Sequence, residues 1–82
     1  MHMMIYLHKL VADGYIAFSE IVLLTSDSAT IVINGVVLKF IRKEHKGVKN
    51  VLFLLSKDNA AVAMGNTKII KALKNSRNVN SN

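Results

Sequence analysis

Turn-forming dipeptides most constrain the fold of this chain, because they divide its first half into short runs of β-branched and aromatic residues. Asn34-Gly35 lies between the runs Ala29–Ile33 and Val36–Ile41. A type I′ turn requires a positive φ at both central residues, which Asn and Gly tolerate. Asp13-Gly14 is a second hairpin signal, and it follows the apolar run Met3–Val11. We therefore predict strands over these three runs, with turns at both dipeptides.

Further apolar runs extend the predicted sheet. Tyr15–Thr25 has strand-like composition, but its apolar phase changes at Ser19-Glu20, which indicates a bulge or a short turn between two strands. The short polar residues 26–28 predict another turn. Val51–Leu55 is continuously apolar, which is typical of a central strand covered on both faces. The segment Arg42–Lys49 before it is polar and basic, and we predict a connecting loop there.

The last third of the chain predicts a helix. Ala60–Met64 is either a short strand ending at Gly65 or the first turns of a longer helix. Asn66 is a favoured N-cap residue, so we predict the helix over Thr67–Asn75. Such a helix places on one side the apolar residues Ile69, Ile70 and Leu73.

Together these elements predict one small α+β domain over residues 1–75. It has a mainly antiparallel sheet of about five or six short strands and one C-terminal α-helix. The polar residues 76–82 offer little to bury, so we expect a disordered tail. Half of the residues are hydrophobic, at 51%, and a domain this small cannot bury all of them. We therefore expect a homo-oligomer, with a monomer as the alternative.

Charge is divided unevenly along the chain. Residues 1–41 hold two lysines against three acids, a net charge of −1, whereas residues 42–82 hold nine Lys or Arg against two acids, a net charge of +7. These values add to the +6 of the whole chain. A chain that segregates charge in this way can present one positive face to a polyanion.

The positive charge gathers in two clusters, and we predict that both contact nucleic acid. The predicted loop supplies Arg42, Lys43, Lys46 and Lys49, and the predicted helix supplies Lys68, Lys71 and Lys74. Lysines can meet phosphates as point charges, whereas Arg42 alone could form a bidentate contact with guanine. The alternative is structural: lysines keep sheet edges from pairing, and cations near a helix C-terminus favour the helix dipole.

These clusters favour a DNA-binding protein, a small transcription regulator that binds duplex DNA, over RNA binding. The rival hypothesis is a non-enzymatic interaction module or inhibitor, of phage or mobile-element type, that docks on an acidic protein surface. Catalytic motifs are lacking, and the three histidines (His2, His8 and His45) have no metal-ligand spacing, so we expect neither an enzyme nor a cofactor or metal. The absence of cysteine suits the cytoplasm, and no apolar run reaches the ~18 residues of a membrane span.

Several stretches resemble small bacterial DNA-binding β proteins, namely the LytTR-type domain and the RemA-type matrix regulators. The resemblance consists of hydrophobic spacing over much of the chain, in Ile5-x-Leu7, Gly14-x-Ile16, Ile21-x-Leu23, Thr25-Ser26-x-Ser28-Ala29, Val51-Leu52-Phe53-Leu54, Ser56-Lys57-Asp58-Asn59-Ala60 before Val62, and Ile70 with Leu73. It implies DNA contact from the segment before the penultimate strand, at Lys46 and Lys49, where the RemA-type proteins carry arginines. The chain departs from that family over Ile31–Ile41, which predicts a hairpin where the family has a helix.

Overall fold

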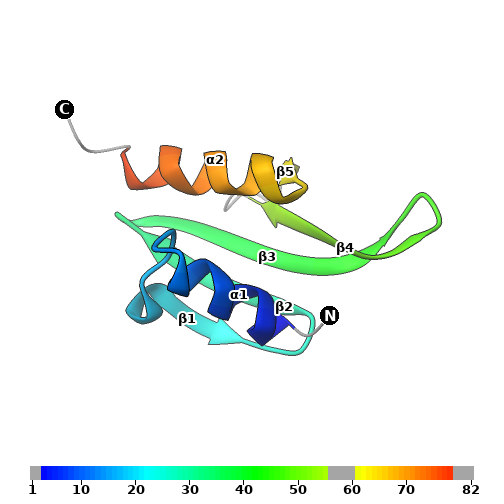
Figure 1. Ribbon diagram of the computed structural model, residues 1–82, viewed down its shortest axis with the longest axis horizontal. Helices are drawn as coiled ribbons and strands as arrows, with labels where there is room; N and C mark the ends of the chain where they lie inside the picture. The colour runs from blue at the N-terminus through cyan, green and yellow to red at the C-terminus, as the bar shows by residue number, and fades with distance from the viewer. Residues whose placement is uncertain (1–2, 56–60, 79–82) are drawn as a thin grey trace.

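The computed structural model describes residues 3–55 and 61–78, and in them an α+β fold with a five-stranded antiparallel sheet (Figure 1). The strands pair in the order in which they follow one another along the chain. The elements are α1 (Met3–Ala12), a 3₁₀ turn η1 (Phe18–Glu20), β1 (Ile21–Leu24), β2 (Ser28–Ile33), β3 (Val36–His45), β4 (Val48–Leu55), β5 (Ala61–Met64) and α2 (Asn66–Arg77). No helix among the described residues is long and apolar enough to span a membrane.

Both helices pack against one face of the sheet and enclose the core with it. On β2 alternate residues are buried, and cross-strand pairing joins Ile31 to Leu38 and Phe40 to Leu54 on the same face. Onto these side chains α1 packs Leu7 and α2 packs Ile69. Alternate residues of a strand point to opposite faces of the sheet. Because both helices contact the same set of residues, neither helix covers the opposite face.

The first predicted strand is wrong, because residues 3–12 form helix α1. Its buried residues recur at the helical spacing i, i+3, i+4 and i+7, namely Met3, Tyr6, Leu7 and Leu10. Gly14, at φ +83°, ends the helix rather than turning a hairpin. The Gly14 amide donates to the Val11 carbonyl and the Tyr15 amide to the Leu10 carbonyl, each at 3.0 Å, which is the Schellman pattern.

Three other predictions are confirmed. Asn34-Gly35 turns the β2–β3 hairpin with φ of +51° and +78°. The run Val51–Leu55 lies within β4, a central strand between β3 and β5; Leu54 is buried beneath the helices, whereas Phe53 is buried on the face that neither helix covers. The phase change at Ser19-Glu20 is a short turn, η1, and a bulge follows it in β1. Only Ile21–Leu24 of the predicted Tyr15–Thr25 run is a strand.

The C-terminal elements correct the predicted boundaries. Residues 61–64 are the strand β5, whereas residue 60 lies outside the described residues. Helix α2 begins at Asn66, so the predicted N-cap is wrong; Gly65 holds the cap position, and the Asn66 Oδ1 accepts a hydrogen bond from the Tyr6 hydroxyl at 3.2 Å. Ser76 and Arg77, predicted as tail, form the last turn of α2. Residues 79–82 of the predicted tail lie outside the described residues.

The predicted basic loop is also wrong, because residues 42–49 continue β3 and begin β4. The two strands pair as far as His45 and Val48, around a Lys46-Gly47 turn with φ of +50° and +80°. Strand β2 pairs with β3 only as far as Ile41, and β5 pairs with β4 only from Phe53. Residues 42–52 therefore form a two-stranded ribbon, here called the arm, that extends beyond the rest of the sheet (Figure 1).

Candidate nucleic-acid interface

The arm gives the molecule its elongated shape, with extents of 42 × 23 × 21 Å. Four residues of β3 lie beyond the last residue paired with β2, so the arm reaches about 14 Å at about 3.4 Å per residue. Asn50, at φ +62°, lies at an irregularity where the register changes between the Lys43–Val51 pair and the His45–Val48 pair. A bulge of this kind increases the local twist of a ribbon.

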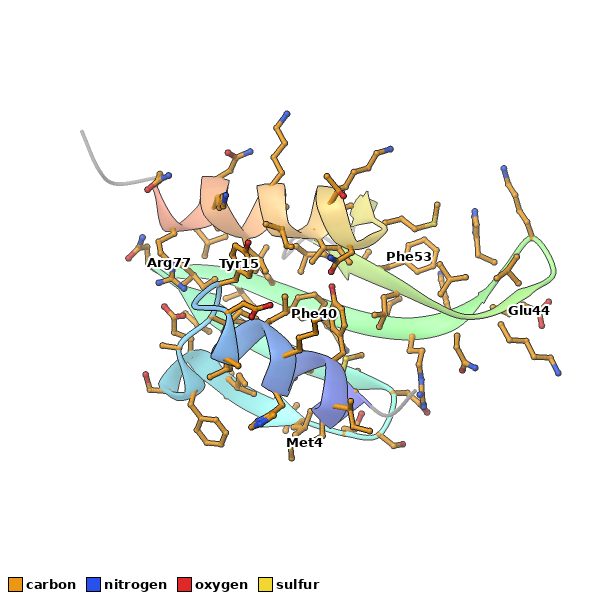
Figure 2. The ribbon with its side chains drawn as sticks, viewed as in Figure 1. Met4, Tyr15, Phe40, Glu44, Phe53 and Arg77 are labelled. Atoms are coloured by element: carbon orange, nitrogen blue, oxygen red, sulfur yellow. The ribbon has the colours of Figure 1, made fainter. Side chains whose placement is uncertain are left out.

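Two lysines lie at the end of the arm. Lys46 is the first residue of the turn and Lys49 follows it on β4, and both side chains are exposed. Glu44 is the one carboxylate on the arm, and Figure 2 shows it near the turn. Among the described residues the ion pairs are Arg42–Asp27 and Arg77–Glu20, so neither lysine is neutralised by a carboxylate.

A second group of lysines lies on the solvent side of α2. Lys68, Lys71 and Lys74 are exposed, whereas Ile69 and Leu73 are buried against the sheet. The amphipathic pattern predicted from the sequence is therefore present. The Lys74 Nζ lies 5.7 Å from the centre of the Tyr15 ring, a distance that allows a cation–π contact.

The other two predicted contact residues lie elsewhere. Arg42 is at the base of the arm, where its guanidinium donates to the Asp27 carboxylate at 2.9 Å and to the Ser26 carbonyl at 3.3 Å; its side chain is only 15% exposed. Lys43 lies on the helix-free face of the sheet, with its Nζ 5.0 Å from the centre of the Phe53 ring. The four residues predicted to act together from one loop are thus separated.

The second arginine is also engaged with a carboxylate. Both terminal nitrogens of Arg77 donate to Glu20, at 2.6 and 2.9 Å, and one also donates to the Tyr15 carbonyl at 3.1 Å. Figure 2 shows Arg77 and Tyr15 at the same end of α2. The hydrogen bonds from Arg77 lower the pKa of the Glu20 carboxyl, and the same contact raises the pKa of Arg77. The sequence contained no sign of this pair, because 57 residues separate its members.

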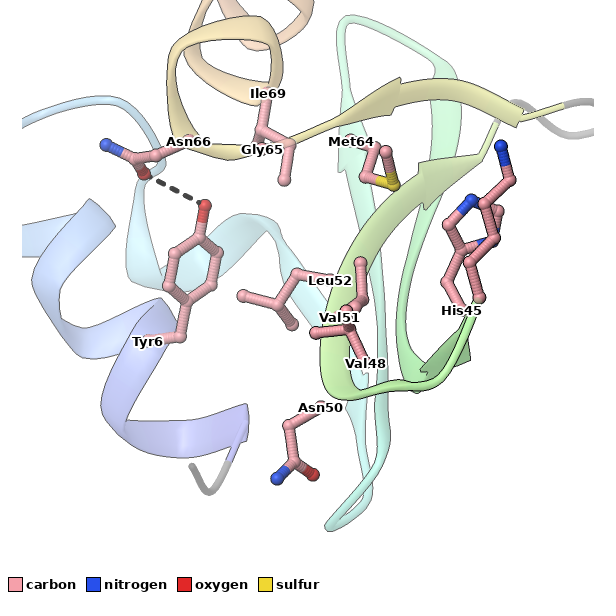
Figure 3. A pocket seen from close by; sticks show the side chains of 11 residues that line it. Tyr6, His45, Val48, Asn50, Val51, Leu52, Met64, Gly65, Asn66 and Ile69 are labelled. Carbon is pink, nitrogen blue, oxygen red and sulfur yellow. Dashed lines mark hydrogen bonds between the residues drawn. The ribbon is translucent and has the colours of Figure 1, made fainter.

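A pocket of about 480 Å³ lies along the arm, beside the start of α2 (Figure 3). Its walls are mostly apolar and include Leu52, Met64 and Ile69, and Lys46 is the one charged lining residue among those described. The Tyr6 hydroxyl, bonded to Asn66, lies at its edge, and burial raises the pKa of Tyr6. This pocket was not predictable from the sequence, because its walls come from five elements, α1, β3, β4, β5 and α2, and from the turn at Lys46.

The described residues contain no group of three or more His, Asp or Glu side chains that could hold a metal ion. Comparison of the chain with family models, with curated proteins and with solved structures finds no match. The resemblance to LytTR-type and RemA-type proteins therefore stays a prediction. The geometry of the lysines is what remains to indicate a function.

Proposed function

We propose that this protein binds duplex DNA, with the end of the arm in a groove and the outer side of α2 along the phosphates. The observation that carries the proposal is the two-stranded arm that ends in Lys46 and Lys49, neither of which forms an ion pair with a carboxylate of the described residues. The major groove of B-DNA is about 12 Å wide and admits a two-stranded β-ribbon. An arm of about 14 Å is long enough to enter a groove about 8.5 Å deep.

The lysines on α2 supply the second part of the proposed contact. Lys68, Lys71 and Lys74 come from an element that is separate from the arm, so the two groups can reach different phosphates. Each phosphate that a lysine neutralises releases a counterion, which favours binding at low salt. The proposed role is transcription regulation in the cytoplasm by a homo-oligomer, with Arg42 removed from the set of DNA contacts because Asp27 holds it.

The test is a salt titration of binding to a duplex of fixed sequence. For wild type, the logarithm of the association constant should fall linearly with the logarithm of the salt concentration. Lys49→Ala should weaken binding to all sequences alike and reduce the magnitude of that slope by about one. Lys71→Ala should have the same effect from the helix.

The matched control is Lys9→Ala, which removes one exposed lysine from α1, away from the arm and from the outer side of α2. This control should keep the wild-type slope. Absence of DNA binding by wild type at about 50 mM salt would contradict the proposal, because phosphate contacts are strongest there. So would a Lys49→Ala slope equal to that of the control.

The apolar pocket favours a second candidate function, the docking of an acidic peptide of a partner protein. Lys46 borders apolar walls that could take a side chain of such a peptide. A partner bound in this way would stay bound after nuclease treatment, and Leu52→Trp, which fills the pocket, would release it. Loss of every interaction on nuclease treatment would leave DNA binding as the function.

A further inference from the structure

The helix-free face of the sheet, here called the open face, is mostly apolar, and its charged residues are Lys39 and Lys43. Cross-strand pairing brings together two rows on it, Leu23–Thr30–Lys39–Leu55 and Ile41–Phe53–Met64, with the pair Val32–Val37 beside them. Leu23 is 60% exposed, Met64 42% and Val37 38%, although all three are large apolar side chains. Both described helices pack on the opposite face, so neither covers these residues.

The size of the open face is that of an interaction surface. Five strands about 4.8 Å apart, which contribute about 13–20 Å of length each, give a projected area of roughly 400 Å². Apolar patches of about 300–600 Å² are the largest on typical monomers and often functional. Two sheets can stack through such faces at a distance of about 10 Å, as in a β-sandwich.

We propose that the open face binds the open face of a second copy of this chain, so that the protein is a homodimer joined sheet to sheet. A two-fold dimer requires a self-complementary surface, and two apolar sheet faces of the same twist can pack on each other. This inference rests on the proposed function in one respect: it identifies the surface through which the proposed homo-oligomer forms. The lysines of α2 lie on the opposite side of the molecule, so dimerisation leaves them exposed to DNA.

Charge makes this dimer weak and gives it an unusual response to salt. Two such faces bury about 800–1,200 Å² in total, the low end of specific interfaces. Lys39 and Lys43 lie on the face, the residues paired with them include no acid, and each copy carries a net charge of +6. Like charges therefore oppose association, and salt screens that repulsion. Salt should strengthen the dimer, whereas it weakens DNA binding.

The experiment is analytical ultracentrifugation of the full chain without DNA, at about 50 mM and about 500 mM salt. Wild type should dimerise at micromolar concentration, with a lower dissociation constant at the higher salt. Val37→Lys adds a charge to the open face and should raise the dissociation constant at least tenfold. Ile5→Lys is the matched control, since Ile5 is 64% exposed on α1, and it should leave the dissociation constant unchanged. Lys39→Met should lower it.

The variants also separate other modes of association. A wild-type protein that is monomeric at both salt concentrations overturns the proposal. A Val37→Lys protein that dimerises like wild type also overturns it, because this result would indicate association through another surface, such as the edges of the sheet. Tighter association at low salt, or weaker association of Lys39→Met, indicates that Lys39 meets a carboxylate and also overturns it. Circular dichroism of each variant confirms that the fold is kept. Because DNA is absent, these results are independent of the salt titration of DNA binding.

Discussion

At the scale of single residues, the two arginines and the lysines have different roles. Arg77 and Arg42 each form an ion pair that ties distant segments together: Arg77 joins the end of α2 to η1, and Arg42 joins the arm to the turn before β2. The planar guanidinium suits such two-pronged contacts, whereas a lysine is a mobile point charge. The lysines are therefore left to carry the positive field of the surface.

The Arg77–Glu20 pair predicts a pH dependence of stability. Because its pKa is lowered in the folded state, Glu20 contributes stability that is present above its unfolded pKa of about 4.3 and is lost as the pH falls through its lower folded value. Arg77→Met should lower the free energy of unfolding by about 1 kcal/mol at neutral pH, a modest value since Arg77 is partly exposed.

Urea unfolding from pH 7 to pH 2 measures this effect. The difference between wild type and Arg77→Met should shrink as Glu20 takes up a proton and should be smallest below its folded pKa. Asn75→Met, a matched substitution at an exposed position on the same helix, should show no such narrowing. A difference that stays constant with pH would mean that Arg77 stabilises the fold through packing and its hydrogen bond to the Tyr15 carbonyl, and not through Glu20.

At the scale of elements, local sequence predicted some turns and missed others for identifiable reasons. Asn34-Gly35 was predictable because both residues favour a positive φ, whereas Lys46-Gly47 makes the same turn with a lysine that carries no such signal. Met3–Val11 suits either a strand or a helix by composition. The Asp13-Gly14 dipeptide was interpreted as a hairpin turn and favoured the strand. This interpretation was wrong, because glycine is equally common at a helix C-terminus.

The two glycine turns should respond differently to alanine. A Cβ at Gly35 or Gly47 meets nothing within 4 Å, so the cost of either substitution comes from the positive φ, about 1–2 kcal/mol. Gly35→Ala should lower the melting temperature, because that turn joins two strands of the core. Gly47→Ala should lower it less, because the end of the arm can open without the rest of the sheet.

Hydrogen exchange measured by NMR separates the two outcomes. Gly47→Ala should speed exchange within the arm and leave the amides of β2 unchanged, whereas Gly35→Ala should speed exchange throughout the sheet. Equal losses of melting temperature with uniform exchange would show that the arm unfolds only with the whole domain.

At the scale of the whole molecule, composition predicted that the surface charge is positive, but it did not predict where each basic residue lies. The second half of the chain carries the excess charge, as the sequence shows, yet folding assigns Arg42 to an ion pair and Lys43 to the open face. Those outcomes depend on which face of a strand a residue occupies, and the arm was predicted as a loop without faces. The pocket was equally unpredictable, because five separate elements and a turn build it.

Selectivity for DNA sequence should consequently be low. A good bidentate contact discriminates between bases by about 1–3 kcal/mol, but both arginines of this chain are engaged with carboxylates. Affinities for unrelated duplexes of equal length, measured by competition, should therefore differ by less than about tenfold, with narrow or flexible grooves preferred through shape. A single duplex that outcompetes the others a hundredfold would show that base contacts exist.

The order of the strands in the sheet has a consequence for how the chain reaches its native state. Every strand pairs with its neighbour in sequence, so the sheet forms without bringing remote segments together first. Low contact order of this kind favours fast folding, because little loop-closure entropy is lost before pairing begins. The chain has no proline, which removes the slowest isomerisation from the process. The contacts between Tyr6 and Asn66 and between Glu20 and Arg77 join the two ends of the fold, so we expect them to form last, because their closure joins segments about 60 residues apart.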